Sequence, residues 1–269
     1  MAELTATAPG SGPDPRPFRA SVRARATWLA FLVAFVWAAS RIELTWDRFL
    51  RGLEGAARFV SRMFPPVFEP HAELVKGMVE SLEIAILASA LGVLLSLPIG
   101  LMAARNLLPG FITWPTRLFV TLCRSFHPVI LAIVFVKAIG FGALAGILAL
   151  TIASIGFLGK LFAEAIEEIS MKQIEAVRAT GASFANVLTF AVVPQVVFRF
   201  IGFMAYETDA NLRNSTMVGI VGAGGIGGTL FSAFQRFDYD YVFGIVICII
   251  ALVIIGEGLQ IAVKRAFRQ

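Results

Sequence analysis

Residues 175–194, EAVRATGASFANVLTFAVVP, form a polar segment between two strongly apolar ones. The chain before this segment contains an uncharged run at 138–159, and it becomes apolar again from Ala191. Between these apolar parts lies a block, starting at Lys160, with charged residues at nearly every turn. The contrast favours a short polar excursion between two membrane spans.

Within this block the residue pattern predicts two short helices joined at Gly181. Gly181 suits the C-terminus of one helix, and Ser183 suits the N-cap of the next. Pro194 is expected to fix where the following membrane helix begins. The apolar positions form an irregular stripe, opposite most of the charges: Ile166, Ile169, Ile174 and Val177. An ordinary amphipathic loop helix would show the same pattern.

The composition indicates an all-α polytopic membrane protein. Of the 269 residues 58% are hydrophobic and only 15% are charged, whereas soluble domains are about 45–50% apolar. Several uncharged runs approach the length of about 20 residues that a membrane helix needs. The net charge of +5 comes from basic residues at the segment ends, which is typical of cytoplasmic loops rather than of nucleic-acid binding. Cys123 and Cys248 lie in apolar segments and are expected to be packing residues.

Hydropathy and charge together predict about six transmembrane helices, with both chain ends in the cytoplasm. Residues 1–25 are expected to be a disordered cytoplasmic tail, 26–73 the first span with an interfacial helix, and 74–269 the main transmembrane domain. The spans are expected at about 26–44, 74–104, 118–136, 141–159, 193–209 and 241–263.

The segment from Trp46 to Phe64 differs from the spans because its apolar residues recur at helical spacing and its charged residues occupy the other side. This pattern predicts an amphipathic helix lying in the membrane interface. An ordinary surface helix packed on the bundle fits equally well. Pro65 and Pro66 are expected to end the helix.

Five glycines crowd the seven residues 222–228. The spacing formally matches a dinucleotide fingerprint, but the flanks are membrane spans and an acidic residue about 20 positions later is missing. Each glycine costs about 1 kcal/mol in a helix relative to alanine, so a break in the helix is predicted. Non-helical backbone at membrane depth must be buried in protein or line a watery cavity. The stretch therefore predicts a gate or translocation path, with close packing through small residues as the alternative.

The quoted segment also matches a known pattern: E-A-A, three residues, G, nine residues, I-x-L-P. In this register Val177, Ala191 and Val193 replace the third alanine, the isoleucine and the leucine. The segment thus resembles the EAA loop of ABC-importer permeases, which docks into a groove on a cytoplasmic ATPase. The resemblance implies a type I (MetI-like) permease fold with a coupling loop at about 160–192. The coupling residues that it implies are Glu175, Ala176, Ala179, Gly181 and Pro194.

The later segments ETDANLRNS and FQRFDYDY resemble the phosphonate branch of these permeases, over about residues 75–265. This resemblance implies the translocation of a phosphonate, or of a related oxyanion such as phosphite or phosphate, by alternating access. A methionine-type or other small-solute permease is the alternative, because the STMVG-and-glycine piece occurs in that branch too.

Polar and ionisable residues inside spans are candidates for the translocation path. Cationic side chains would favour an anion, and hydroxyl or amide groups would donate hydrogen bonds to its oxygens. The alternatives are that Arg199 extends to the membrane surface and that Glu207 or Asp209 only pairs with Arg213. The candidates for path or gate are Arg124, His127, Arg213, Asn214, Ser215, Thr216, Gly222, Gly224, Gly225 and Gly227.

The resemblance implies a large assembly in the bacterial inner membrane. It comprises a second, identical permease, two ATPase subunits that hold ATP and Mg²⁺, and a periplasmic or lipid-anchored phosphonate-binding protein. The chain itself is expected to bind no cofactor, metal or nucleic acid. No H-E-x-x-H, G-x-S-x-G or Walker A motif points to an enzyme. A proton-coupled carrier using Glu83 and Glu257 is the remaining rival.

Overall fold

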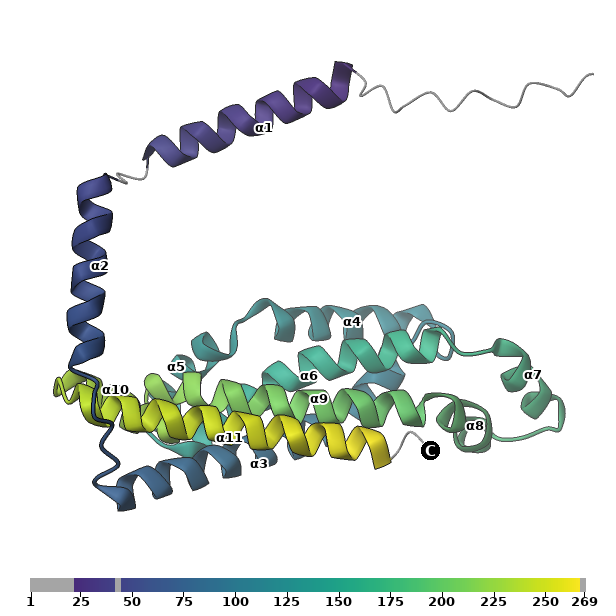
Figure 1. Cartoon of the computed structure of the whole chain (residues 1–269). Coiled ribbons are helices and arrows are strands. Elements are labelled where there is room, and N and C mark those ends of the chain that lie inside the picture. Colours follow the sequence, from purple (N-terminus) through teal and green to yellow (C-terminus); the bar gives the residue numbers. More distant parts are fainter. Residues whose placement is uncertain (1–21, 42–44, 267–269) are drawn as a thin grey trace, which may run out of the picture. The chain divides into compact units, whose positions relative to one another are not determined.

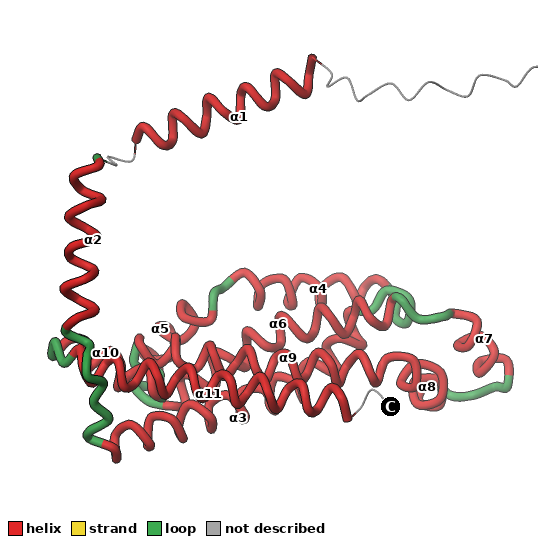
Figure 2. The backbone as a smooth tube through the Cα atoms, in the orientation of Figure 1, coloured by secondary structure: helices red, strands yellow, loops and turns green. Residues whose placement is uncertain are grey.

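The computed structural model describes residues 22–41 and 45–266, and these residues are almost entirely helical (Figure 1, Figure 2). The chain divides into two compact units, residues 1–59 and 60–269. Most of the predicted N-terminal tail, and the cytoplasmic placement of the N-terminus, lie outside the described residues.

The first unit consists of α1 (Val22–Arg41) and most of α2 (Trp46–Ser61). Helix α1 covers most of the first predicted span, and α2 covers the predicted amphipathic segment, ending before Pro65. Along the charged side of α2 the arginines Arg51 and Arg58 donate from Nε to backbone oxygens four residues earlier. The interfacial placement of α2 and its packing on the bundle both remain predictions.

The second unit is a helical bundle with a polar extension at one end (Figure 1). Its helices are α3 (His71–Ala103), α4 (Gly110–Ser125), α5 (Pro128–Ile139), α6 (Ala143–Glu167), α7 (Met171–Ala179), α8 (Phe184–Val187), a π-helical turn (Leu188–Val192), α9 (Val193–Ile220), α10 (Ile226–Gln235) and α11 (Tyr239–Ala266).

Four of the described helices are long and apolar enough to cross a membrane, namely α3, α6, the helix 184–220 that contains α9, and α11. The number rises to six if each of two bent pairs, α1 with α2 and α4 with α5, forms one span. The all-α polytopic fold predicted from the sequence is thereby confirmed.

Small residues bring α6 into close contact with its neighbours. A Cβ atom on Gly92 of α3 would lie only 2.5 Å from Cβ of Ser154 in α6. A Cβ atom on Gly156 of α6 would lie 2.7 Å from Cγ of Arg124 in α4. Such close approach of backbones is the usual way in which helices associate in lipid, and it makes α6 the centre of the bundle.

The prediction of one continuous helix at 118–136 for the third span is wrong. Helix α4 ends at Ser125, α5 begins at Pro128, and the two are bent by 87°. A residue before proline avoids the helical conformation, and His127 is accordingly extended (φ −69°, ψ 140°). Its Nδ1 accepts a hydrogen bond from the Val129 amide at 3.3 Å, which caps α5.

Two predicted spans were too short. Helix α6 runs on from 159 to Glu167, and the pair Lys160–Glu164, at 3.3 Å and one turn apart, lies on this extension. Helix α9 runs on from 209 to Ile220, so the residues between the predicted span and the glycine stretch are helical. Two polar residues of this extension form hydrogen bonds: Asn211 with serines of α3 and α6, and Ser215 with the Leu212 carbonyl.

Candidate functional site

The predicted coupling loop forms the polar extension at one end of the bundle, where α7 and α8 connect α6 to α9 (Figure 1). Only Ile174 of α7 is fully buried, in an apolar cluster with Ile166, Val187 and Val192. The predicted apolar stripe is confirmed, since Ile169 and Val177 also pack on this cluster. Helix α7 is thus anchored through one side.

The other side of α7 faces outward. Ala176 and Ala179 lie opposite Ile174 on the helix, and both are exposed, as is Glu175. Small exposed residues at these positions form a low, open surface on which another protein can approach the backbone closely. This is the geometry that a docking helix requires.

The predicted caps between α7 and α8 are confirmed. Gly181 has φ +78°, and its amide donates to the Arg178 carbonyl at 2.9 Å, which closes α7. Ser183 Oγ accepts from the Asn186 amide at 3.4 Å, which opens α8.

Pro194 lies at the start of α9, directly after the π-helical turn 188–192. A proline has no amide hydrogen and its ring crowds the carbonyl four residues earlier. The wider π-turn accommodates this ring without ending the helix. The helix therefore passes through Pro194 and begins further back, at Phe184. The prediction that Pro194 fixes where the membrane helix begins is wrong.

A buried polar network joins the middles of three helices. Asn211 of α9 donates from Nδ2 to Ser89 Oγ of α3 at 3.0 Å and to Ser154 Oγ of α6 at 2.9 Å. Ser154 Oγ in turn donates to Glu207 Oε1 at 2.6 Å. All four side chains are buried. Sequence reasoning missed Ser89 and Ser154, because isolated serines in apolar helices are common and carry no spacing signal.

Replacing Asn211 with alanine is expected to lower the stability of the bundle by about 1–3 kcal/mol, because Glu207 and two serines lose a satisfied network. The thermal unfolding midpoint of the purified chain in detergent measures the change. Asn214→Ala is the control. Asn214 is half-buried and lies three residues further along α9, and its replacement is expected to change the midpoint little. Equal midpoints in both variants would show that the network contributes no stability.

Arg213 is held by a charge on its own helix. Its Nη1 lies 2.6 Å from Oδ2 of Asp209, whose side chain is 5% exposed while that of Arg213 is 43% exposed. The pairing considered from the sequence is confirmed. Asp209 Oδ1 has no hydrogen-bond partner among the described residues, so the carboxylate is only half satisfied by the chain itself.

The other predicted path residues of α9 lie on different sides of the helix. Ser215 is buried and donates to the Leu212 carbonyl at 2.8 Å, so its hydroxyl points into the bundle. Asn214 and Thr216, one and three residues after Arg213, are partly exposed. The structure therefore separates Ser215 from the other three.

The glycine stretch breaks the helix between α9 and α10, as predicted. Gly222, Gly224 and Gly225 have φ of +89°, +81° and +81°, values that side chains rarely allow. The break is held by neighbours: Gly222 O accepts from the Gly142 amide at 3.0 Å, and the Ile226 amide donates to Ser81 Oγ at 2.9 Å. The non-helical backbone is thus enclosed by protein.

Close packing, the alternative considered for the glycines, holds at Gly227. A Cβ atom there would lie 1.9 Å from the Thr216 carbonyl oxygen, so α10 presses against the end of α9. The glycine stretch therefore contains both a break in the helix and a close packing contact between α9 and α10. Its role as a gate stays a prediction.

Arg124 and His127, the other predicted path residues, lie elsewhere. Arg124 lines a pocket of about 350 Å³ between α4 and α6, to which α9 contributes no residue in the described chain. His127 is exposed at the bend between α4 and α5, where it caps α5. The structure thus does not bring Arg124 together with Arg213 in one cavity.

The chain is similar in sequence to a transport family and to individual permeases of that family. Residues 96–269 match the model of the family described as the binding-protein-dependent transport system inner membrane component. The chain is similar to the phosphate-import permease protein PhnE of Mycolicibacterium smegmatis, with 42% identity over 202 residues, which are 74% of this chain and 38% of that protein.

It is also similar to the phosphite transport system permease protein PtxC of Stutzerimonas stutzeri, with 36% identity over 220 residues, 81% of this chain and 80% of that protein. Among solved structures, an inward-facing form of the MetNI methionine ABC transporter superposes with a TM-score of 0.65. That match covers 75% of this chain and 99% of the other at 24% identity, and it concerns the fold alone.

Proposed function

Because the chain belongs to the family of binding-protein-dependent transport system inner membrane components, we propose that it carries a phosphorus oxyanion through the bacterial inner membrane. The substrate is a phosphonate, or phosphite or phosphate, all of which are tetrahedral oxyanions. The observation that carries this proposal is the similarity to permeases named for phosphate and phosphite over most of the chain.

Helix α9 supplies the side chains suited to such a substrate. A charged residue within a span faces protein or water rather than lipid, and Arg213 is half exposed even though Asp209 pairs with it. Asn214 and Thr216 add amide and hydroxyl donors beside it. We therefore place the translocation path along this face of α9, next to the glycine break.

The outward face of α7 couples the permease to its energy source. In this proposal Glu175, Ala176, Ala179 and Gly181 contact a separate ATPase subunit, which binds ATP and Mg²⁺ and hydrolyses the nucleotide. The end of the bundle that carries α7 then lies in the cytoplasm together with the end of α11, and both chain termini lie on that side. Closure of the ATPases would move the two α7 helices together and expose the path to the outside.

The working assembly contains two copies of this chain, two ATPase subunits and a periplasmic or lipid-anchored binding protein. One chain supplies one coupling helix, so a pair of ATPases needs a pair of permeases. A methionine-type permease is the second candidate, because the fold is shared with MetNI. The substrate decides between the two.

ATPase activity of the assembled complex in lipid nanodiscs tests the proposal. With the cognate ATPase and binding protein present, we expect stimulation by an alkylphosphonate, phosphite or phosphate, and none by methionine. Arg213→Ala is expected to assemble normally but to reduce uptake of the stimulating oxyanion about tenfold, as for the loss of a charged hydrogen bond.

Stimulation by methionine alone would replace the substrate and keep the permease function. Failure of the chain to assemble with any ATPase would contradict the coupling role of α7. Unchanged uptake in Arg213→Ala would remove this residue from the path.

A further inference from the structure

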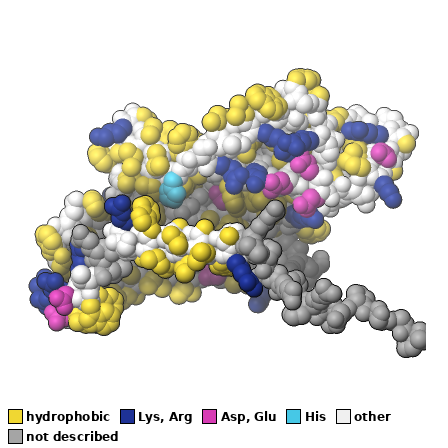
Figure 3. Space-filling view, turned by 90° about the horizontal axis from the view of Figure 1, so that it is seen from above, with side chains coloured by type: hydrophobic (Ala, Val, Ile, Leu, Met, Phe, Trp, Pro, Cys, Tyr) yellow, Lys and Arg dark blue, Asp and Glu magenta, His cyan; other side chains and the backbone are white. Residues whose placement is uncertain are grey.

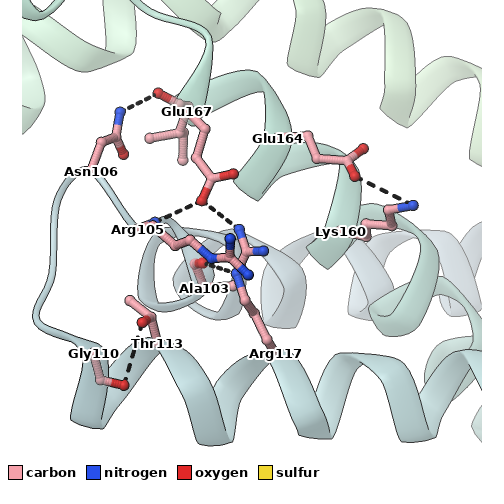
Figure 4. A network of polar contacts seen from close by, with 10 residues as sticks. Ala103, Arg105, Asn106, Gly110, Thr113, Arg117, Lys160, Glu164 and Glu167 are labelled. Carbon is pink, nitrogen blue, oxygen red and sulfur yellow. Dashed lines mark hydrogen bonds and ion pairs between the residues drawn. The ribbon is translucent and has the colours of Figure 1, made fainter.

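Four cationic side chains converge on the pocket between α4 and α6, at the same end of the bundle as α7. They come from three places: Arg105 from the α3–α4 loop, Arg117 and Arg124 from α4, and Lys160 from α6. Figure 4 shows Arg105, Arg117 and Lys160 with the two glutamates of this region. The space-filling view shows Lys and Arg side chains next to Asp and Glu side chains on one face (Figure 3).

One wall of the pocket is fixed by Arg117 of α4, which bonds to the ends of α3 and α6. Its Nε donates to the Ala103 carbonyl at 2.8 Å, and its Nη2 forms an ion pair with Glu167 (Figure 4). Glu167 Oε1 also accepts from the Arg105 backbone amide at 2.8 Å. The loop is fixed further by Asn106, whose Nδ2 donates to the Ile166 carbonyl at 2.7 Å.

The charges in this region do not cancel. Glu167 compensates Arg117, and Glu164 lies 3.3 Å from Lys160. The side chains of Arg105 and Arg124 have no carboxylate within 4 Å in the described chain. Four cations against two carboxylates leave a surplus of two positive charges. A dianion would neutralise this surplus.

The pocket also extends along α4. Arg124 lies two helical turns beyond Arg117 on α4, a rise of about 10 Å, and its stem is pressed against Gly156 of α6. Val120 and Ala163 supply apolar walls. Arg105, Arg124 and Lys160 are exposed, so an anion can reach their charged groups from solution.

From this geometry we propose that the pocket is a binding site for a phosphoryl-type dianion, a tetrahedral phosphorus oxyanion with two negative charges. Guanidinium groups bind such oxygens in pairs of parallel hydrogen bonds, and two unpaired guanidinium groups are present. Both a free oxyanion entering the cytoplasm and the phosphate of an anionic lipid have this chemistry. That the occupant is the released substrate rests on the proposed function, whereas the affinity for the dianion does not.

Equilibrium dialysis of radiolabelled phosphate against the complete permease–ATPase complex tests the site. The complex is held in phosphatidylcholine nanodiscs without nucleotide or binding protein. Wild type is expected to bind phosphate saturably, and Arg105→Ala and Arg124→Ala are expected to bind it about tenfold more weakly or worse, because each removes a charged hydrogen bond.

Two further variants separate binding from general effects of charge and folding. Glu164→Gln frees Lys160 and is expected to tighten phosphate binding several-fold, which a misfolded protein would not do. Arg265→Ala removes an exposed charge near the end of α11, outside the pocket, and is expected to leave binding unchanged. Arg124→Lys keeps the charge but loses the paired geometry, so an intermediate loss is expected.

A parallel titration in nanodiscs containing phosphatidic acid identifies the source. Weaker apparent phosphate binding in these discs, restored by washing the lipid out, assigns the pocket to the lipid phosphate; unchanged binding assigns it to the free oxyanion. Either result supports the site. The absence of saturable binding from both sources, or equal losses in Arg124→Ala and Arg265→Ala, overturns it.

The titration contains neither ATP nor binding protein, so its outcome is independent of transport. A complex that binds phosphate here but is stimulated only by methionine would contradict the proposed substrate and retain the site. A complex that imports a phosphorus oxyanion without binding it here would retain the function and remove the pocket.

Discussion

Gly227→Ala is expected to prevent correct folding of the permease, whereas Gly228→Ala is expected to be tolerated. The added methyl group on Gly227 would lie 1.9 Å from the Thr216 carbonyl oxygen and 3.0 Å from the Ile220 amide nitrogen. Both contacts are with backbone, which cannot turn aside as a side chain can. The junction of α9 and α10 must open, at a cost of about 3 kcal/mol or more.

Gly228 is the matched control because it is the next residue of the same helix. A methyl group there would lie 3.6 Å from the nearest atom, the Gly219 carbonyl oxygen, which is an ordinary contact. Alanine is favoured over glycine in a helix by about 1 kcal/mol, so this variant should unfold at the same or a slightly higher temperature. Unfolding midpoints and purified yields in detergent provide the comparison; two variants with wild-type midpoints would disprove the close packing of α9 on α10.

Ala176→Trp is expected to abolish copurification of the ATPase while leaving the permease folded. Ala176 is exposed on the side of α7 opposite the buried Ile174, so a large side chain there meets no residue of this unit. It would instead stand between α7 and any protein that docks on its outward face. We expect at least a tenfold loss of bound ATPase, with an unchanged unfolding midpoint.

Gly55→Trp in α2 controls for the effect of an added tryptophan. Its Cβ would meet no atom within 4 Å in the described chain, and α2 lies in the other unit of the protein. This variant should retain its ATPase. Equal ATPase yields from Ala176→Trp, Gly55→Trp and wild type would show that the partner docks elsewhere.

Much of the coupling loop was predictable because its determinants are local. Gly181 and Ser183 are cap residues whose preferences depend on a few neighbouring backbone groups, and both perform that role here. The apolar stripe around Ile174 was likewise predictable from helical spacing.

The bend between α4 and α5 was missed although Pro128 was in view. Hydropathy measures the length of an apolar run but not whether the helix axis bends within it, so 118–136 was predicted as one span. The local evidence for a break was the proline at 128, because a residue before proline avoids the helical conformation. The structure has His127 extended accordingly. Prolines inside α3 and α4, at Pro98 and Pro115, leave those helices intact, so a proline alone does not decide the matter.

The polar contacts between helices were beyond sequence reasoning. Arg117 and Glu167 are 50 residues apart, and Ser89 and Asn211 are 122 apart. Only the packing of α3, α4, α6 and α9 brings them together. For the same reason the cationic pocket around Arg124 had no pattern in the sequence, although each of its four cationic residues was visible as a charge.

The π-helical turn before Pro194 has a mechanical consequence. Because it bridges α8 and α9 without a loop, residues 184–220 form one unbroken rod of 37 residues, about 55 Å long. The opposite junction, between α6 and α7, passes through three residues outside either helix, 168–170. Residues 180–183 also lie outside both α7 and α8, so a push on α7 reaches the rod through the packing of Ile174 against Val187 and Val192. The rod then carries the push lengthwise. The rod contains Asn211 and ends at the glycine break, so a force applied by a docked partner would be transmitted to the non-helical backbone between α9 and α10.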